Sequence, residues 1–222
     1  MTTVGIIGSG MIGGTVARLS VAAGHRVVVS NSRGPETLAE LAAELGPLAT
    51  AGTAEQAAEA GDLVVVSVPV KAFGEISVKP LAGKPVLDTG NYYPQRDGHL
   101  AELDTGALTS SGLLQRDLPD AQVVKVFNNI FFRHLASLAR PHGAEDRSAL
   151  PIAGDSAAAK AAVTAFLDSI GYDAVDAGPI ADSWRQEPGT PVYGTPYGPL
   201  SDEAGTPAPA ARIRADLVAA YR

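Results

Sequence analysis

The sequence predicts an α/β fold built on a doubly wound parallel sheet, followed by a small C-terminal extension. Two observations lead to this class. Over the first 130 residues, short β-branched stretches alternate with alanine- and leucine-rich stretches that are typical of helices. The β-branched stretches are continuously apolar, as expected for parallel strands that helices cover on both faces. Strand–helix–strand repetition at this spacing is what a doubly wound sheet requires.

The predicted elements follow one another in a regular order. Pro35 suits the first turn of the second helix, and Thr53 with Gln56 forms a capping-box pattern that starts the third. The predicted strands are residues 4–8, 26–30, 48–51, 62–68, 85–88, 122–127, 150–154 and 173–175. The predicted helices are residues 11–23, 35–45, 53–61, 128–140, 156–170 and 211–222.

The composition excludes several classes of protein. The chain has 222 residues, no cysteine and a formal net charge of −7. Thiol chemistry and cysteine-ligated metals are therefore excluded, no metal site is expected, and the acidic balance argues against nucleic-acid binding. Apolar runs such as residues 63–66 fall well short of the roughly 18 residues that a membrane helix needs. A strand that begins at Val4 leaves no room for a secretion signal, so we expect a cytoplasmic protein that binds no membrane.

The most informative motif is a glycine loop between the first strand and the first helix. Gly8 permits the tight turn, Gly10 allows a pyrophosphate to approach the backbone, and Gly13 permits close helix–strand packing. The pattern is weak alone and strong in this βαβ context, so it predicts a Rossmann-like dinucleotide site rather than a merely structural turn. The residues expected to contact the cofactor here are Gly8, Ser9, Gly10, Met11, Ile12 and Gly13.

The end of the second strand predicts a preference for NADP(H). An NAD site usually places an acidic residue there for the ribose 2′-hydroxyl, whereas this strand runs into Asn31, Ser32 and Arg33. A hydroxyl and a guanidinium suit a 2′-phosphate that a carboxylate would repel. The alternative is that Ser32 only caps the following helix and Arg33 is solvated.

Three further segments arrive at the carboxyl ends of strands, where ligands of open α/β sheets bind. Val68 and Pro69 end the fourth strand, Asn91 follows the fifth, and Asn128 follows the sixth. All four are predicted cofactor-binding positions. Val68 and Pro69 are predicted from their place at the strand end, and the two asparagines also because an asparagine can both donate to and accept from a carboxamide or a ribose hydroxyl. Helix caps and turns are the alternative role for both asparagines.

Over about residues 1–180 the chain resembles NADPH-dependent coenzyme F-420 (deazaflavin) reductases and the related metalloreductase domains. The segments that carry the resemblance are VGIIGSGMIGGTVA, NSRGPE, VFNNI, IAGD and GYDAVDAGP, in that order. The resemblance implies a homodimer and hydride transfer between NADPH and a deazaflavin or flavin-type acceptor. It also implies NADP contacts at Ser9, Met11, Ser32, Arg33, Pro69 and Asn128.

The resemblance implies an NADP-binding Rossmann domain over residues 1–140 and a small C-terminal portion over residues 141–222. Within that portion, residues 186–210 hold six prolines and four glycines, which excludes a regular element. The sequence after Gly178 departs from the family's C-terminal helices. This part of the chain would enclose the electron acceptor. Because it departs from the family, the resemblance does not identify which acceptor is used.

No dedicated catalytic residue is expected, because hydride transfer between two rings needs stacking and exclusion of water more than an acid or base. Tyr92 and Tyr93, with a cluster at Phe127, Phe131 and Phe132, suit a planar acceptor. The phenylalanines also suit a core or a dimer interface.

A second reading is an NADPH-dependent imine or carbonyl reductase, for which Tyr92, Tyr93 and His134 are the candidate proton donors. A third is a non-enzymatic NADP(H) sensor. Tyr193 and Tyr197 in the proline-rich segment either belong to the acceptor side or pack across a partner subunit.

Overall fold

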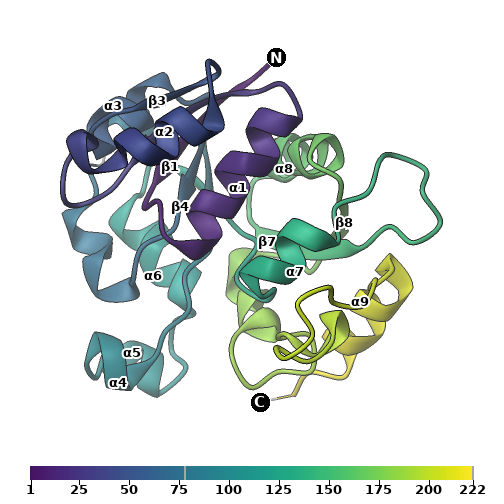
Figure 1. Cartoon of the computed structure of the whole chain (residues 1–222). Helices are drawn as coiled ribbons and strands as arrows, with labels where there is room; N and C mark the ends of the chain where they lie inside the picture. The colour runs from purple at the N-terminus through teal and green to yellow at the C-terminus, as the bar shows by residue number, and fades with distance from the viewer. Residues whose placement is uncertain (78, 222) are drawn as a thin grey trace.

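The computed structural model describes residues 1–77 and 79–221. Its strands form one sheet in the order β3-β2-β1-β4-β5-β6-β7-β8 (Figure 1). The strands are β1 (Thr3–Ile7), β2 (Arg26–Ser30), β3 (Ala49–Ala51), β4 (Leu63–Val66), β5 (Pro85–Asp88), β6 (Gln122–Lys125), β7 (Ala149–Gly154) and β8 (Asp173–Asp176). The first six are parallel, β7 pairs antiparallel with β6, and β8 is parallel to β7.

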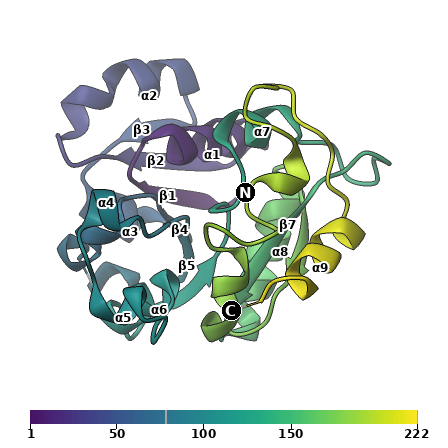
Figure 2. The same cartoon turned by 90° about the horizontal axis from the view of Figure 1, so that it is seen from below.

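Helices cover the two faces of this sheet (Figures 1 and 2). The helices are α1 (Met11–Ala22), α2 (Ala39–Leu45), α3 (Ala54–Ala60), α4 (Pro94–Asp97), α5 (Ala101–Asp104), α6 (Ser110–Asp117), α7 (Phe132–Ser137), α8 (Ala157–Ser169) and α9 (Ala210–Val218). Five short 3-10 segments complete the described elements: η1 (Pro35–Leu38), η2 (Val70–Glu75), η3 (Lys79–Leu81), η4 (Ile180–Gln186) and η5 (Thr195–Tyr197).

The doubly wound α/β class predicted from the sequence is confirmed. All four β4 residues are buried, and they alternate between two cores. Leu63 and Val65 face the core shared with α1 and α8, whereas Val64 and Val66 face the core shared with α3 and α6. The predicted capping box is also present, because Thr53 Oγ1 accepts from the Gln56 N–H and the Gln56 side chain accepts from the Thr53 N–H.

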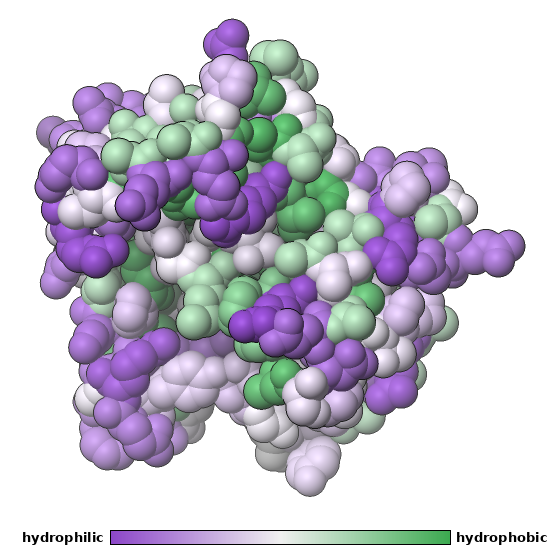
Figure 3. All heavy atoms as spheres, in the orientation of Figure 1, coloured by the Kyte–Doolittle hydropathy of each residue, from purple (hydrophilic) through white to green (hydrophobic). Residues whose placement is uncertain are grey.

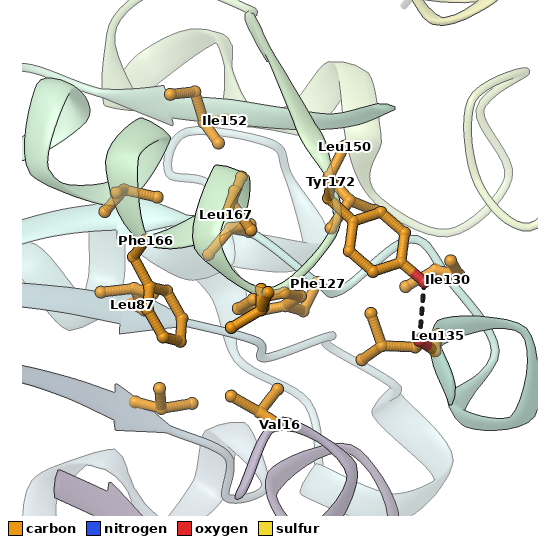
Figure 4. Close-up of a cluster of buried hydrophobic side chains, with 14 of the residues drawn as sticks. Val16, Leu87, Phe127, Ile130, Leu135, Leu150, Ile152, Phe166, Leu167 and Tyr172 are labelled. Atoms are coloured by element: carbon orange, nitrogen blue, oxygen red, sulfur yellow. Dashed lines mark hydrogen bonds between the residues drawn. The ribbon is translucent and has the colours of Figure 1, made fainter. Parts of the chain in front are cut away.

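One core runs beneath both the nucleotide-binding strands and the C-terminal portion (Figure 4). Val16 of α1 and Leu87 of β5 pack in the same cluster as Phe166 of α8. Tyr172, fully buried, donates from its hydroxyl to the Leu135 carbonyl of α7 at 2.6 Å. The division at residue 140 remains a prediction, since β7 and β8 continue the sheet and share its core.

The predicted helix over residues 128–140 is confirmed only over residues 132–137. Phe127 has a φ of +65°, a left-handed conformation that turns the chain sharply after β6. Asn128 and Asn129 then bury their side-chain amides in hydrogen bonds to distant backbone carbonyls, so α7 begins only at Phe132. Phe127 is itself fully buried in the core, which excludes it from the predicted wall of the acceptor site.

The Pro/Gly-rich segment is ordered against its own chain. The Tyr197 hydroxyl donates to the Ala149 carbonyl at 2.9 Å, and the Ala149 N–H donates to the Ala208 carbonyl at 2.8 Å. The only helical turn between residues 187 and 209 is the short η5. Tyr197 is thus a core residue of this chain and not a contact to a partner subunit. Of the final predicted helix, residues 211–218 are helical, and Arg222 lies outside the described residues.

Within residues 1–77 and 79–221, no helix is both long enough and apolar enough to cross a membrane.

Candidate cofactor site

The glycine loop has the geometry that its three glycines predict. Gly8 has a φ of +99°, and a Cβ there would lie 2.3 Å from the Ser67 carbonyl oxygen. A Cβ on Gly13 would lie 2.0 Å from the Gly8 carbonyl oxygen, so the helix packs directly on the turn. A Cβ on Gly10, by contrast, would have no described atom within 4 Å, so the backbone there faces open space. A ligand can therefore approach the main chain at Gly10.

The N-terminus of α1 is free to bind an anion. Gly10 is its N-cap, no side chain caps it, and the first turn holds no acidic residue. The first N–H groups of a helix carry partial positive charge and are the usual partners of a pyrophosphate. Ser9 is held in place by its hydroxyl, which donates to the Ser30 carbonyl at 2.8 Å. Met11 is 69% exposed at the mouth of the site, whereas Ile12 packs against the core.

The loop after β2 is shaped by Asn31. Its Oδ1 accepts from the Arg33 N–H at 2.9 Å, and its Nδ2 donates to Thr37 Oγ1 at 2.9 Å. Ser32 and Arg33 are both exposed, and the following helical turn is capped by Gly34 without any side-chain bond. Ser32 is therefore not a helix cap. Asn31 holds the loop and leaves Ser32 and Arg33 as the groups that a 2′-phosphate can contact.

The carboxyl ends of β1, β4 and β5 lie side by side. The Ser67 N–H donates to the Ile7 carbonyl at 2.8 Å, and the Thr89 N–H donates to the Val66 carbonyl at 3.1 Å. Val68, half-buried, and Pro69, exposed, follow β4 at this edge. The predicted positions after β2, β1, β4 and β5 thus occupy neighbouring strands in the sheet order.

A chain of three amides closes the β5–β6 side of the edge. Asn91 Nδ2 donates to the Asn128 carbonyl at 2.8 Å, and Asn128 Nδ2 donates to Asn91 Oδ1 at 3.0 Å. Asn128 Nδ2 also donates to the Gln186 carbonyl at 2.6 Å, while Gln186 Nε2 donates to Asn128 Oδ1 at 3.1 Å. Asn128 is 5% exposed and spends its amide on Asn91 and Gln186. In this structure Asn128 orients Asn91, and its predicted contact with the cofactor stays a prediction. No sequence pattern marks Gln186.

The three candidate proton donors differ in their surroundings. The Tyr92 hydroxyl donates to Asp104 and accepts from the Leu100 N–H, contacts that lie outside the strand edge. His134 is 1% exposed, and its Nε2 bonds the Asp202 carbonyl beneath the C-terminal segment. The Tyr93 hydroxyl instead meets the Tyr193 hydroxyl at 2.5 Å, which joins the loop after β5 to the C-terminal segment.

Asp97 fixes the backbone below this tyrosine pair. Its carboxylate accepts from the Tyr93 N–H at 3.0 Å and from Arg96, whose guanidinium also lies 5.0 Å from the Tyr93 ring centroid. Desolvation acts to raise the pKa of the Asp97 carboxyl, but the bonds from Arg96 and Tyr93 outweigh it and lower that pKa. The carboxylate is therefore the form that stabilises the loop.

We expect Asp97→Asn to lower the free energy of unfolding at pH 7 by about 1–3 kcal/mol, since charge-assisted bonds are lost. A carboxyl whose pKa is lowered on folding stabilises above its unfolded pKa of about 4, and that contribution is lost as pH falls through the folded value. The difference from wild type should therefore shrink at pH 3. Urea unfolding at the two pH values measures it, and an equal loss at both would contradict this role.

A groove of about 840 Å³ crosses the outer surface of α1, between α2 and α7. It reaches the glycine loop at Ser9–Met11, and Phe132 and Leu41 line it. The ion pair between Arg18 and Glu44 lies along it, with its shorter N–O distance at 2.6 Å. Figure 3 shows this face of the molecule with charged and apolar residues intermixed. The groove leaves the glycine loop accessible from solvent.

Fold and site together define the class. A parallel sheet ordered 3-2-1-4-5-6, with a glycine loop after its first strand, is a Rossmann dinucleotide-binding unit. Residues 3–92 match the model of the family described as NADP oxidoreductase, coenzyme F420-dependent. This segment is therefore similar to a family of NADP-dependent oxidoreductases, in line with the resemblance seen in the sequence. The matched segment is less than half of the chain.

Similar proteins extend the likeness to the rest of the chain. Protein SMa0349 from Sinorhizobium meliloti, named as hypothetical, has a solved structure with a TM-score of 0.75 and 28% identity, covering 86% of this chain and 93% of that one. A protein of Arthrobacter sp. FB24, provisionally named an F420-dependent NADP reductase, gives a TM-score of 0.68 and 26% identity over 82% and 87% of the two chains. Protein YjhV of Escherichia coli K12 is 43% identical over 53 residues, which are 24% of this chain and 39% of that relative.

Proposed function

We propose that the protein transfers a hydride between NADPH and a deazaflavin or flavin-type acceptor. The observation that carries the proposal is the open backbone at Gly10 beside the uncapped start of α1, with exposed Arg33 in the loop after the neighbouring strand β2. In the sheet order β2, β1, β4, β5, the predicted sites for 2′-phosphate, pyrophosphate and nicotinamide follow one another as they do along the cofactor. Neighbouring strands are about 4.8 Å apart, so a dinucleotide spans several of them.

Asn91 is the group that we assign to the nicotinamide end. Its amide has two donors and an oxygen with two lone pairs. One donor and one lone pair are used by Asn128. The remaining donor and lone pair match a carboxamide, and Asn128 with Gln186 fixes the orientation in which Asn91 offers them. Ser9, Met11, Ile12, Val68 and Pro69 would form the rest of the cofactor's contacts.

The acceptor would lie between the nicotinamide and the wall made by residues 89–94 and the C-terminal segment. Bound NADPH supplies the hydride, and the chain's own task is to align the two rings and exclude water. The family match over residues 3–92 and the lack of a charged acid–base pair among the predicted site residues both support a ring acceptor. The resemblance further implies a homodimer, and light scattering of the purified protein tests its subunit number. The cytoplasmic location stays a prediction from the sequence.

The proposal is tested by mixing the protein with NADPH and an oxidised deazaflavin and following the loss of deazaflavin absorbance. Stoichiometric loss of NADPH and of deazaflavin absorbance is the expected result, and an oxidised flavin is assayed in parallel. Tight NADPH binding with no turnover of any acceptor would instead favour an NADP(H) sensor. Turnover of cyclic imines or ketones, with no deazaflavin reduction, would favour the second candidate.

That second candidate, an imine or carbonyl reductase, is favoured by the tyrosine pair. Burial, followed by the hydrogen bond to Tyr93, raises the pKa of the Tyr193 hydroxyl, so it stays protonated at neutral pH. The pair carries two hydroxyl hydrogens, and only one of them lies in the bond between the two oxygens, so the other can be donated to a substrate at the wall of the proposed acceptor site.

Tyr193→Phe and Tyr93→Phe separate the two candidates. A ring acceptor needs no proton from either hydroxyl during hydride transfer, so we expect kcat to stay within about threefold of wild type. A reductase that protonates its substrate would lose about 10²–10⁴-fold. Steady-state kinetics with deazaflavin and with a cyclic imine make the comparison, and Tyr92→Phe is the matched control because its hydroxyl lies among α4–α5 contacts.

A further inference from the structure

A lysine and an aspartate are both completely buried at the carboxyl edge of the sheet. Lys125 ends β6 and Asp88 ends the neighbouring β5, each with no exposed side-chain surface, and Lys125 Nζ lies 3.9 Å from Asp88 Oδ2. Neither residue is among the predicted contacts of the cofactor. Burying two charges is costly unless every donor and acceptor is satisfied. The hydrogen bonds of Lys125 and Asp88 therefore indicate the role of the pair.

The lysine uses all three of its donors. Lys125 Nζ donates to the Gly90 carbonyl at 2.9 Å, to Ser110 Oγ at 2.8 Å and to Ser111 Oγ at 3.1 Å. An ammonium has three N–H groups and no acceptor, so its capacity is filled. The site thus offers one acceptor to each of the three N–H groups.

The same pair holds the Gly90 residue from both sides. Asp88 Oδ1 accepts from the Gly90 N–H at 2.7 Å, while Lys125 donates to the Gly90 carbonyl. A Cβ on Gly90 would lie 2.8 Å from Asp88 Oδ1 and 2.9 Å from the Phe73 ring, so this position has no room for a side chain. The chain leaves this fixed point directly into Asn91, Tyr92 and Tyr93.

The network also reaches the C-terminal segment. Glu187 accepts from both the N–H and the hydroxyl of Ser110, each at 2.8 Å. Ser111, the next residue of α6, donates to Asp88 Oδ2 at 2.6 Å. Glu187 adjoins Gln186, which orients the Asn91 amide through Asn128. The two walls of the proposed acceptor site are therefore tied to a single buried charge.

We propose that Lys125 is a positioning residue, which sets Asn91 and Tyr93 against the nicotinamide end by fixing the Gly90 carbonyl. The expected effect of Lys125 on catalysis rests on the proposed function. Its expected effect on the loop at Gly90 rests on the structure alone. A pair of well-packed apolar residues would stabilise a sheet edge at least as well as a buried ion pair. An apolar pair could not hydrogen-bond the N–H and the carbonyl of Gly90, and so could not fix their position.

The test compares three variants. Lys125→Met removes the ammonium and leaves Asp88 charged and unpaired. Asp88→Asn with Lys125→Met removes both charges but keeps an oxygen for the Gly90 N–H, so it avoids the unpaired buried carboxylate of the single variant. Lys84→Met is the matched control, because Lys84 Nζ also donates to two backbone carbonyls, of Ala58 and Glu59, but at the amino end of β5.

The first readout is amide hydrogen exchange over residues 90–93 in the protein without ligands. We expect exchange there to rise at least about tenfold in the double variant, as local opening becomes easier, and to stay at the wild-type rate in Lys84→Met. The second readout is kinetic. The kcat/KM for the acceptor should fall about 100-fold, while the Kd of adenosine 2′,5′-bisphosphate, which lacks nicotinamide, stays within about twofold.

Unchanged exchange over residues 90–93 in the folded double variant would overturn the proposal. Faster exchange with unchanged acceptor kinetics would overturn the positioning role as well. If the wild-type protein reduces no acceptor, the proposed function fails, yet the exchange measurement still decides whether Lys125 fixes this loop.

Discussion

Gly10→Ala is expected to abolish NADPH binding while the protein stays folded. Gly10 has φ −76° and ψ −157°, which alanine adopts without strain, and no described atom lies within 4 Å of the added methyl. The exchange of glycine for alanine at a helix N-cap costs only about 1 kcal/mol. In the bound state, however, the methyl occupies the space that the pyrophosphate needs. We expect the NADPH Kd to rise at least about 100-fold, as fluorescence titration would measure.

Gly13→Ala is the informative comparison, because it should fail for the opposite reason. Its methyl would lie 2.0 Å from the Gly8 carbonyl oxygen and 3.3 Å from the Ile6 side chain. Overpacking against backbone atoms cannot be relieved by a side-chain rotation, and we expect a loss of about 3 kcal/mol or more in the free energy of unfolding. Equal thermal stability of the two variants, or wild-type NADPH affinity in Gly10→Ala, would contradict the assigned roles.

Arg33→Ala is expected to remove most of the preference for NADPH over NADH. A hydrogen bond to a charged group contributes about 1.5–3 kcal/mol, which corresponds to a rise of roughly 10–100-fold in the NADPH Kd. The NADH Kd should not change, since NADH has no 2′-phosphate. Asn31 holds the loop through the Arg33 N–H, which alanine keeps, so the backbone should be undisturbed.

The matched control for that variant is Arg26→Ala. Arg26 is exposed like Arg33 but begins β2, at the opposite edge of the sheet. Its removal changes the net charge equally and should leave both affinities unchanged. A similar loss of NADPH affinity in the two arginine variants would mean that bulk charge, not a 2′-phosphate contact, sets the preference. NADH binding by the wild type as tight as its NADPH binding would contradict the predicted preference for NADPH.

The nucleotide-binding half could be predicted from the sequence because its signals are local. β2 and β5 have the bounds that their β-branched runs predict, and the capping box at Thr53 is present. The glycine loop is equally local as a sequence pattern, since its glycines lie within six residues of one another and Gly13 packs directly on Gly8. The order of strands then follows from the handedness of strand–helix–strand crossovers.

The acceptor side could not be predicted in the same way. Asn128 was expected to contact the cofactor, yet its partner Gln186 is 58 residues away, and no local pattern announces the bond. The sequence around Lys125 is that of an ordinary polar residue at the end of a strand. Its burial against Asp88 and Ser110 is apparent only in the folded structure. The helix break at Phe127 depends on the same distant contacts, because a left-handed phenylalanine persists only where its surroundings hold it.

The antiparallel direction of β7 sets the order in which the two sides of the site are completed during synthesis. Since β7 runs away from the carboxyl edge and β8 follows it, the chain must return through η4 before Gln186 and Glu187 reach that edge. The glycine loop and Arg33 need only the first strands to emerge, whereas the Ser110–Glu187 bond spans 77 residues. Chains emerge from the N-terminus, and contacts distant in sequence form last. The residues of the proposed nucleotide site therefore emerge well before those of the proposed acceptor wall.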